Sequence, residues 1–222
     1  MAPDMLFNLL TKALWQTAQM VFVAGLIGSA IGLPIGVFLA TSGKGELYEA
    51  PMINRIVGLI VNATRSTPFI ILVVAIIPFT RLIAGTSIGT WAAIVPLTIA
   101  TIPFFARLVE ASIREVDKGL IEAARAMGAT PFQIVVKVLL AEARPGITLA
   151  LTLTVVSLIG YSAMVGAVGG GGLGDLGIRY GYQRFMPEVM AVVVLVLIVL
   201  VQAVQSAGDA LARRFDKRSR KS

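Results

Sequence analysis

Five long stretches without a charged residue constrain this chain more than any other feature. A helix needs about 20 mainly apolar residues to cross a bilayer. The uncharged stretches cover residues 13–43, 66–80, 82–106, 146–174 and 189–208. With 57% hydrophobic and only 14% charged residues, the chain is more apolar than one soluble domain. We therefore expect an all-α polytopic membrane protein with five transmembrane helices, at about residues 13–41, 56–80, 82–106, 146–168 and 189–208.

The distribution of Lys and Arg predicts the orientation of these spans, because cytoplasmic segments carry an excess of both. With the N-terminus outside, 14 of the 19 basic residues fall on the inner side and four on the outer side, while Arg65 lies within the second span. The charged segment 107–144 and the basic tail 209–222 are then cytoplasmic, and the glycine-rich loop 165–187 is periplasmic. Only Lys12 precedes the first apolar run, which is longer than the core of a signal peptide, so we expect this span to be retained.

Several functional classes are disfavoured by composition. The net charge of +7 is explained by the positive-inside rule and by attraction to anionic lipid headgroups. It therefore does not indicate nucleic-acid binding. Cysteine and histidine are absent, which excludes disulfides, thiolate metal sites and a histidine base. Gly172–Gly177 matches G-x-G-x-x-G by letter, but it follows a membrane helix rather than a strand. We expect no enzyme activity, no metal and no cofactor, so energy for uphill transport would have to come from another subunit.

The charged segment 107–144 predicts two short helices. Asp117 suits an N-cap, and Gly128 suits the left-handed residue that ends a helix. The face between them carries apolar residues at helical spacing, namely Leu120, Ala123, Ala124 and Met127. A second helix is predicted to start at once, with Thr130 as N-cap, Pro131 at the first position and Gln133 completing a capping box.

We call these two helices, which meet at Gly128, the elbow. A rigid elbow between spans is suited to docking in a groove of a partner, with Glu122 supplying a hydrogen bond or ion pair. The alternative is an amphipathic helix that lies on lipid headgroups.

Special residues inside the predicted spans indicate helix packing. Gly28, Gly32 and Gly36 recur at four-residue intervals, which allows close approach of a second helix. Pro96 and Pro103 favour an interior position for the third span, because each frees a carbonyl that protein or water must satisfy. Arg65 is expected to face protein or water with a partner, or to snorkel to the inner interface.

The fourth span is the best candidate for lining a pathway, because hydroxyl groups are spread along it. Its candidate residues are Ser157, Tyr161, Ser162 and Met164, with Met164 as a gate or an ordinary packing residue. The fifth span is nearly all Val, Leu and Ile and is expected to face lipid. The eight glycines of residues 165–185 are explained by close backbone packing or by a re-entrant loop sheltered by protein.

The elbow resembles the cytoplasmic loop of ABC importer permeases. That family pattern is E-A-A-x3-G-x9-I-x-L-P, and this chain has Glu122-Ala123-Ala124, Gly128, Val138 and Leu140 at the matching places. Val138 replaces isoleucine, and Ala141 replaces the proline, which leaves the end of the second helix less sharply bounded. Further segments are similar to the permeases of bacterial methionine importers: Arg65–Phe69, Ile77–Arg81, Gly85–Gly89, Ala93–Leu97, Arg125–Pro131, Gly160–Met164 and Tyr180–Tyr182.

The resemblance implies a single transmembrane domain, residues 1–222, that forms a homodimer in the bacterial inner membrane. It also implies two cytoplasmic ATPase subunits, a substrate-binding protein that is often a lipoprotein, and methionine of both L and D forms as solute. The elbow would then couple to an ATPase through Leu120, Glu122, Ala123, Ala124, Met127 and Gly128. Two alternatives stay open: a permease for another amino acid or small amine, and an ion-coupled secondary transporter or channel, although no inverted repeat is evident.

Overall fold

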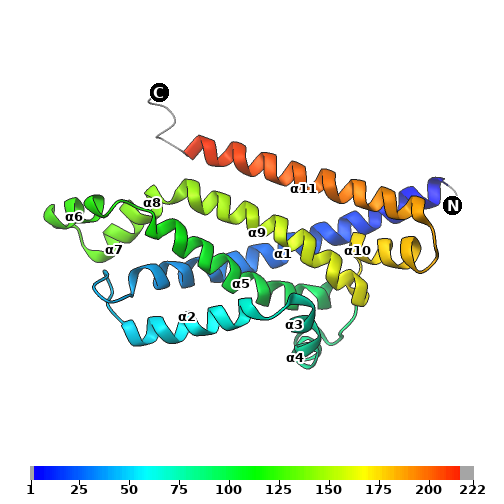
Figure 1. The fold of residues 1–222 in the computed structure, drawn as a ribbon, viewed down its shortest axis with the longest axis horizontal. Helices are drawn as coiled ribbons and strands as arrows, with labels where there is room; N and C mark the ends of the chain where they lie inside the picture. The colour runs from blue at the N-terminus through cyan, green and yellow to red at the C-terminus, as the bar shows by residue number, and fades with distance from the viewer. Residues whose placement is uncertain (1–2, 216–222) are drawn as a thin grey trace. The chain divides into compact units, whose positions relative to one another are not determined.

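The computed structural model describes residues 3–215, and every regular element within them is helical (Figure 1). The α-helices are α1 (Pro3–Thr41), α2 (Pro51–Ser66), α3 (Phe69–Ala75), α4 (Ile77–Ala84), α5 (Thr90–Arg114), α6 (Lys118–Ala126), α7 (Pro131–Gln133), α8 (Leu140–Glu142), α9 (Arg144–Val165), α10 (Gly172–Leu176) and α11 (Pro187–Phe215). Three π-helical segments continue α7, α9 and α10, at Ile134–Leu139, Gly166–Gly170 and Gly177–Tyr182. The all-α prediction is confirmed.

The chain divides into two compact units. The first unit contains residues 1–28, 67–101 and 154–205, and the second contains residues 29–66, 102–153 and 206–222. The core of the first unit includes Met20, Leu97 and Leu158, and a smaller cluster surrounds Leu173. The core of the second unit includes Val109, Ile134 and Leu139, so the elbow packs on the helices that flank it in sequence.

The predicted glycine face of α1 packs against α5. A methyl group at Gly28 would lie 2.5 Å from the Thr101 side chain in the first unit. In the second unit a methyl group at Gly36 would lie 2.5 Å from the carbonyl oxygen of Ala106. Pro96 and Pro103 are both buried on α5, as expected for an interior helix. These contacts confirm the packing interpretation of both motifs.

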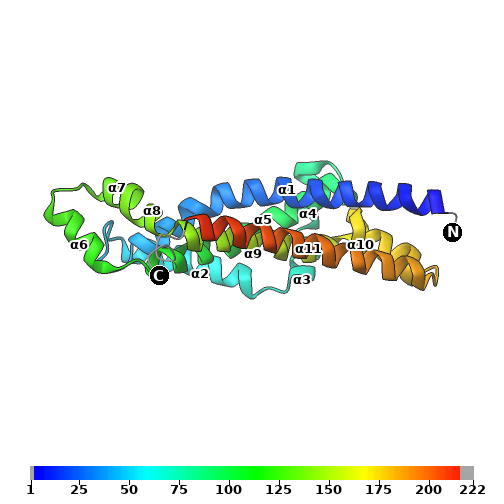
Figure 2. The same cartoon turned by 90° about the horizontal axis from the view of Figure 1, so that it is seen from above.

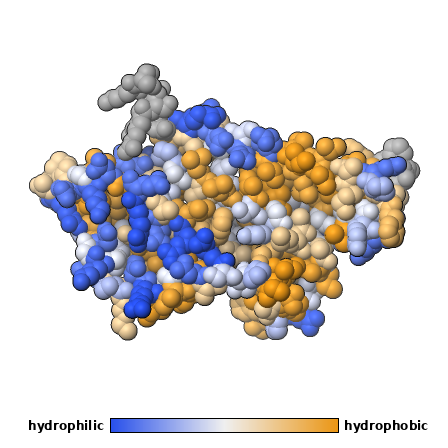
Figure 3. Space-filling model, viewed as in Figure 1, coloured by the Kyte–Doolittle hydropathy of each residue, from blue (hydrophilic) through white to orange (hydrophobic). Residues whose placement is uncertain are grey.

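Four described helices are long and apolar enough to cross a membrane, and five if α2 and α3 together form one broken span. The four are α1, α5, α9 with its π-helical continuation, and α11. Only 11% of the most apolar part of α11 is buried, against 56% for α5, in agreement with the lipid-facing expectation for the fifth span. Figure 3 shows hydrophobic residues over the middle of α11, hydrophilic ones at its C-terminal end, and a mixture of both over the elbow.

The second and third predicted spans differ from the observed helices. Residues 56–80 do not form one helix, because α2 ends at Ser66 and the backbone before Pro68 disfavours the helical conformation. Residues 82–84 belong to α4, and α5 begins only at Thr90. Between them Gly85 and Gly89 have φ angles of 72° and 98°, which only glycine adopts readily. The uncharged run concealed this turn, since its residues are small rather than charged.

The charged segment and the glycine-rich loop also have more helix than expected. Helix α5 continues to Arg114, so the first eight residues of 107–144 extend a span rather than form the elbow. Residues 166–182 are largely helical rather than irregular. Of the predicted basic tail 209–222, residues 216–222 lie outside the described residues.

Candidate coupling and pathway sites

The first helix of the elbow, α6, is capped as the sequence predicts. The Asp117 carboxylate accepts a hydrogen bond of 2.7 Å from the Gly119 backbone N–H. At the other end Gly128 has φ 79°, its N–H donates to the Arg125 carbonyl, and the Ala129 N–H donates to the Ala124 carbonyl. This pair of bonds is a Schellman motif, in which the left-handed residue satisfies the last carbonyls of the helix. No heavy atom lies within 4 Å of a methyl group placed at Gly128, so within the chain its role is conformational.

The second helix of the elbow begins with the predicted capping box. The Thr130 hydroxyl accepts from the Gln133 N–H, and the Gln133 side chain accepts from the Thr130 N–H at 2.9 Å. Helical structure then continues through the π-helical segment to Glu142, past Ala141. A proline would lack a backbone N–H at this place. The continuation of helical structure past residue 141 agrees with the expectation that Ala141, in place of proline, leaves the end of the second helix less sharply bounded.

The apolar residues of α6 divide between two directions. Ala124 is only 4% exposed and packs in the core of the second unit, together with the partly buried Ile121. Leu120 and Met127 are 42% and 82% exposed, and Ala123 is exposed between them. We call Leu120, Ala123 and Met127 the outer face of α6. Figures 1 and 2 show α6 at one end of the second unit, beyond the end of α5.

Glu122 and Gly128 stand at the same exposed end of the second unit. The Glu122 carboxylate is exposed and makes no ion pair within residues 3–215. Phe132 adds a second large apolar side chain, 69% exposed, at the start of α7. The exposed end of the elbow therefore combines apolar surface with one unpaired carboxylate.

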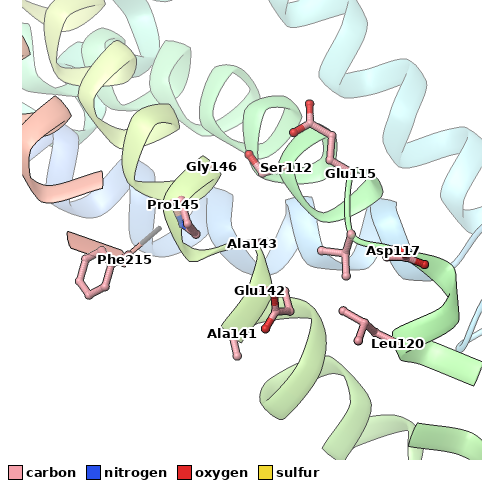
Figure 4. Close-up of a pocket in the computed structure, with 11 residues that line it drawn as sticks. Ser112, Glu115, Asp117, Leu120, Ala141, Glu142, Ala143, Pro145, Gly146 and Phe215 are labelled. Atoms are coloured by element: carbon pink, nitrogen blue, oxygen red, sulfur yellow. The ribbon is translucent and has the colours of Figure 1, made fainter. Parts of the chain in front are cut away.

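A cavity of about 230 Å³ lies at the base of the elbow. Figure 4 shows Phe215 at one end of it, Leu120 at the other and Glu142 between them. Leu120 therefore borders a hollow as well as the outer face.

An ion-pair network around the buried Glu110 joins α5 to α2, and the sequence interpretation missed it. The Glu110 side chain is 7% exposed and pairs with Arg107 at 2.6 Å and with Arg114 at 2.9 Å. Arg107 also donates to the Gly58 carbonyl oxygen and to Asn62 Oδ1, at 3.1 Å and 3.0 Å. The i+3 and i+4 spacing of these charges was the available signal. The network explains how α5 carries three charges without ending at Arg107.

The predicted pathway residues are placed differently from one another. Tyr161 stacks on Phe69 with ring centres 4.4 Å apart, and the buried Ser162 hydroxyl donates to the Ile159 carbonyl. Ser157 is half-buried, whereas Met164 is 49% exposed. Arg65 is exposed at the end of α2, and its side chain has no ion pair in the described part of the chain. In the structure Met164 is therefore accessible, whereas the side chains of Tyr161 and Ser162 make contacts within the chain.

The glycine-rich segment is held by α1, which lies far away in sequence. The Gly172 N–H donates to Gln16 Oε1 at 3.0 Å, and the Leu173 N–H donates to Thr17 Oγ1 at 2.9 Å. Asp175 pairs with Arg179 within the segment. Close packing is extreme here, since a methyl group at Gly174 would lie 2.2 Å from the Ala163 carbonyl oxygen. The prediction of close backbone packing is confirmed.

Among the described residues, no group of three or more acidic, Cys or His side chains could hold a metal ion.

Residues 32–221 match the model of the family described as binding-protein-dependent transport system inner membrane component. The chain is 58% identical over 211 residues to a probable D-methionine transport system permease protein of Vibrio cholerae, covering 95% of this chain and 94% of the relative. It is 56% identical over 158 residues to the D-methionine transport system permease protein of Escherichia coli K12, covering 71% and 73%.

Solved structures give the same relationship. A structure of inward-facing conformations of the MetNI methionine ABC transporter matches with TM-score 0.95 and 52% identity, covering 98% of this chain and all of that chain. An amino acid ABC transporter crystallised with histidines matches with TM-score 0.77 at 23% identity, over 94% of both chains, which supports the fold alone. These relatives are transport subunits rather than enzymes. The chain therefore belongs to the family of inner membrane components of binding-protein-dependent ABC importers.

Proposed function

We propose that the chain is the permease subunit of an ATP-driven methionine importer that accepts the L and D forms. The observation that carries this proposal is the 52% identity to a methionine ABC transporter over all of that transporter's chain, with TM-score 0.95. Two copies of the chain would form the membrane pathway. Two ATPase subunits would bind on the cytoplasmic side, and a substrate-binding protein would deliver the solute from the other side.

The elbow is the proposed point of energy transfer. The outer face of α6 supplies apolar contact, Glu122 supplies a hydrogen bond or ion pair, and Gly128 holds the two helices at a fixed angle. Ala124 supports α6 from within, since it is 4% exposed and packs against its own chain. ATP-driven closure of the ATPase pair would bring the elbows together and turn an inward-open pathway into an outward-open one.

The proposed orientation places the N-terminus in the periplasm and the C-terminus in the cytoplasm. It rests on the excess of Lys and Arg on the inner side and on counting α2 with α3 as one broken span. The glycine-rich segment, which follows α9, is then periplasmic. Cysteine introduced at Lys44 and at Gln183 would test this, because the chain has no cysteine of its own. A membrane-impermeant maleimide should label position 183 and not position 44 in intact cells.

The pathway is proposed to run along the side of α9 that carries Ser157 and Met164. These residues are seven apart and lie on one side of a helix, and Met164 is exposed. Tyr161, four residues after Ser157, would lie on the same side of α9, and Ser162 would support it from behind. Arg65 would face water at the end of α2 that lies away from the cytoplasm. Labelling of cysteines at Ser157 and Met164 should be slowed by added methionine and binding protein.

The decisive test of function is uptake by the complete reconstituted complex. Proteoliposomes with the permease, its ATPase and the binding protein should accumulate radiolabelled methionine only with internal ATP. Excess unlabelled D- or L-methionine should compete, whereas another amino acid should not. Accumulation of a different amino acid would overturn the assignment of methionine as the solute. Uptake that follows an ion gradient without ATP would overturn the ATP-driven mechanism.

A further inference from the structure

The turn between the glycine-rich segment and α11 exposes aromatic side chains. Phe185 is 87% exposed and Tyr182 is 69% exposed. We call Tyr180, Tyr182, Arg184 and Phe185 the aromatic tip. Tyr and Arg are among the residue types that contribute most binding energy in protein interfaces, and Phe is enriched at the cores of such interfaces.

Phe185 has an unfavourable backbone conformation as well as an exposed ring. Its φ angle is 53°, and within residues 3–215 it is the only residue other than glycine with positive φ. For an L-residue this conformation costs about 1–2 kcal/mol. The chain uses glycine at its seven other positive-φ positions. Strain of this kind is often retained at functional sites. The strained and exposed Phe185 is therefore a candidate for a functional contact.

The aromatic tip is ordered rather than loose. The Gln183 N–H donates to the Ile178 carbonyl at 2.9 Å, the Phe185 N–H to the Tyr182 carbonyl at 3.3 Å, and the Met186 N–H to the Tyr180 carbonyl at 3.2 Å. The Arg184 guanidinium lies 4.5 Å from the centre of the Tyr180 ring. A backbone that is held before binding loses less conformational entropy when a partner covers its side chains.

Membrane topology indicates which kind of partner can reach this surface. In the proposed orientation one span, α9, separates the elbow from the glycine-rich segment, so the aromatic tip would face the periplasm, opposite the proposed ATPase site. The family is defined by dependence on a binding protein. A soluble protein that delivers solute must contact the permease on that face.

We propose that the aromatic tip is a docking contact for the substrate-binding protein. Phe185 and Tyr182 would enter an apolar hollow on that protein, and Arg184, held by Tyr180, would pair with an acidic side chain. This inference rests on the proposed function and orientation, and it assigns residues to the delivery step. The competing role is anchoring in the interfacial region of the bilayer, where aromatic residues gather.

The experiment uses the permease–ATPase complex in lipid nanodiscs with the purified binding protein. It compares Phe185→Ala, Phe185→Gly and Phe185→Trp with Phe22→Ala as the matched control, because Phe22 is also highly exposed, at 70%, but lies within α1. Two quantities are measured: the affinity of the binding protein for the complex, and the ratio of ATPase rates with and without it. The apparent melting temperature of each variant is recorded alongside.

Phe185→Ala and Phe185→Gly should weaken binding about tenfold or more and remove most of the stimulation. Phe185→Trp should retain both the binding affinity and the ATPase stimulation. Phe185→Gly should also melt at a higher temperature than Phe185→Ala, because glycine relieves the strain. Phe22→Ala should bind and respond as the unmodified complex does.

The docking role is overturned if binding changes less than about twofold in Phe185→Ala and Phe185→Gly. Reduced melting temperature with intact binding identifies the aromatic tip as a bilayer anchor and also rejects docking. The wild-type complex separates this result from failure of the proposed function, since the same purified complex must show ATP-dependent methionine uptake after reconstitution into proteoliposomes.

Discussion

The elbow and the glycine-rich segment are both short helical structures between spans, yet their conformations have different origins. The elbow is determined mainly by residues close in sequence: Asp117 caps one helix, Gly128 ends it, and Thr130 with Gln133 starts the next. The glycine-rich segment depends on Gln16 and Thr17, which are 156 residues away, and on backbone contact between Gly174 and Ala163. The elbow should therefore tolerate single local substitutions, whereas one substitution in the glycine-rich segment should disrupt the folding of that whole segment.

The largest expected effect is at Gly174. Gly174→Leu would drive its side chain into the Ala163 backbone, since even a methyl group would lie 2.2 Å from that carbonyl oxygen. Backbone cannot move aside as a flexible side chain can, so we expect loss of monodisperse folded protein in size-exclusion chromatography. Gly160→Ala is the control, because Gly160 is in α9 with no heavy atom within 4 Å of its added methyl group. Normal elution of Gly174→Leu would show that the segment is not tightly packed.

A smaller effect is expected from Glu110 of α5, whose partner Arg107 also binds the distant residues Gly58 and Asn62 of α2. Glu110→Gln would leave the half-buried Arg107 and the exposed Arg114 without their shared carboxylate. Loss of the buried carboxylate charge removes both ion pairs, and we expect a clear drop in melting temperature in detergent. Glu122→Gln is the matched control, because Glu122 is exposed and unpaired within residues 3–215. Equal melting temperatures for the two variants would mean that the network contributes little.

Gly128 should show a moderate and local effect. Gly128→Leu forces an L-residue to φ near 79°, at a cost of about 1–2 kcal/mol. The protein should remain folded but bind less ATPase, because the angle between the two helices of the elbow is disturbed. Gly128→Asn should retain more binding, since asparagine tolerates the left-handed conformation. Co-purification of the ATPase with each variant measures this, and equal recovery from both would remove Gly128 from the coupling account.

The smallest effect is expected at the second cap. Thr130→Ala removes the hydroxyl that accepts from the Gln133 N–H and should cost about 1 kcal/mol. Thr130→Ser keeps the hydroxyl and should behave as the original residue does. Hydrogen exchange at Gln133 should rise in the alanine variant alone, and a rise in both would indicate that the cap is not the cause.

The same contrast explains how much could be predicted from the sequence. Both caps of α6 and the capping box at Thr130 follow from local rules, and the glycines of α1 and prolines of α5 indicated buried faces correctly. The turn at Gly85 and Gly89 was missed because an uncharged run does not distinguish a span from a short apolar turn. The direction of Ala124 was also not available, since helical spacing alone cannot tell which of two adjacent apolar stripes faces the core.

The central claim is that the outer face of α6 receives the ATPase, and the double variant Leu120→Glu with Met127→Glu tests it most directly. Met127 is 82% exposed, so a charge there should not disturb folding. We predict that permease carrying Met127→Glu and Leu120→Glu is recovered from the membrane in normal amount and melts normally, but loses its bound ATPase and ATP-dependent methionine uptake. Lys118→Glu is the control for the added negative charge, because it lies on α6 outside that face. Undiminished ATPase recovery and uptake in the double variant would contradict the account.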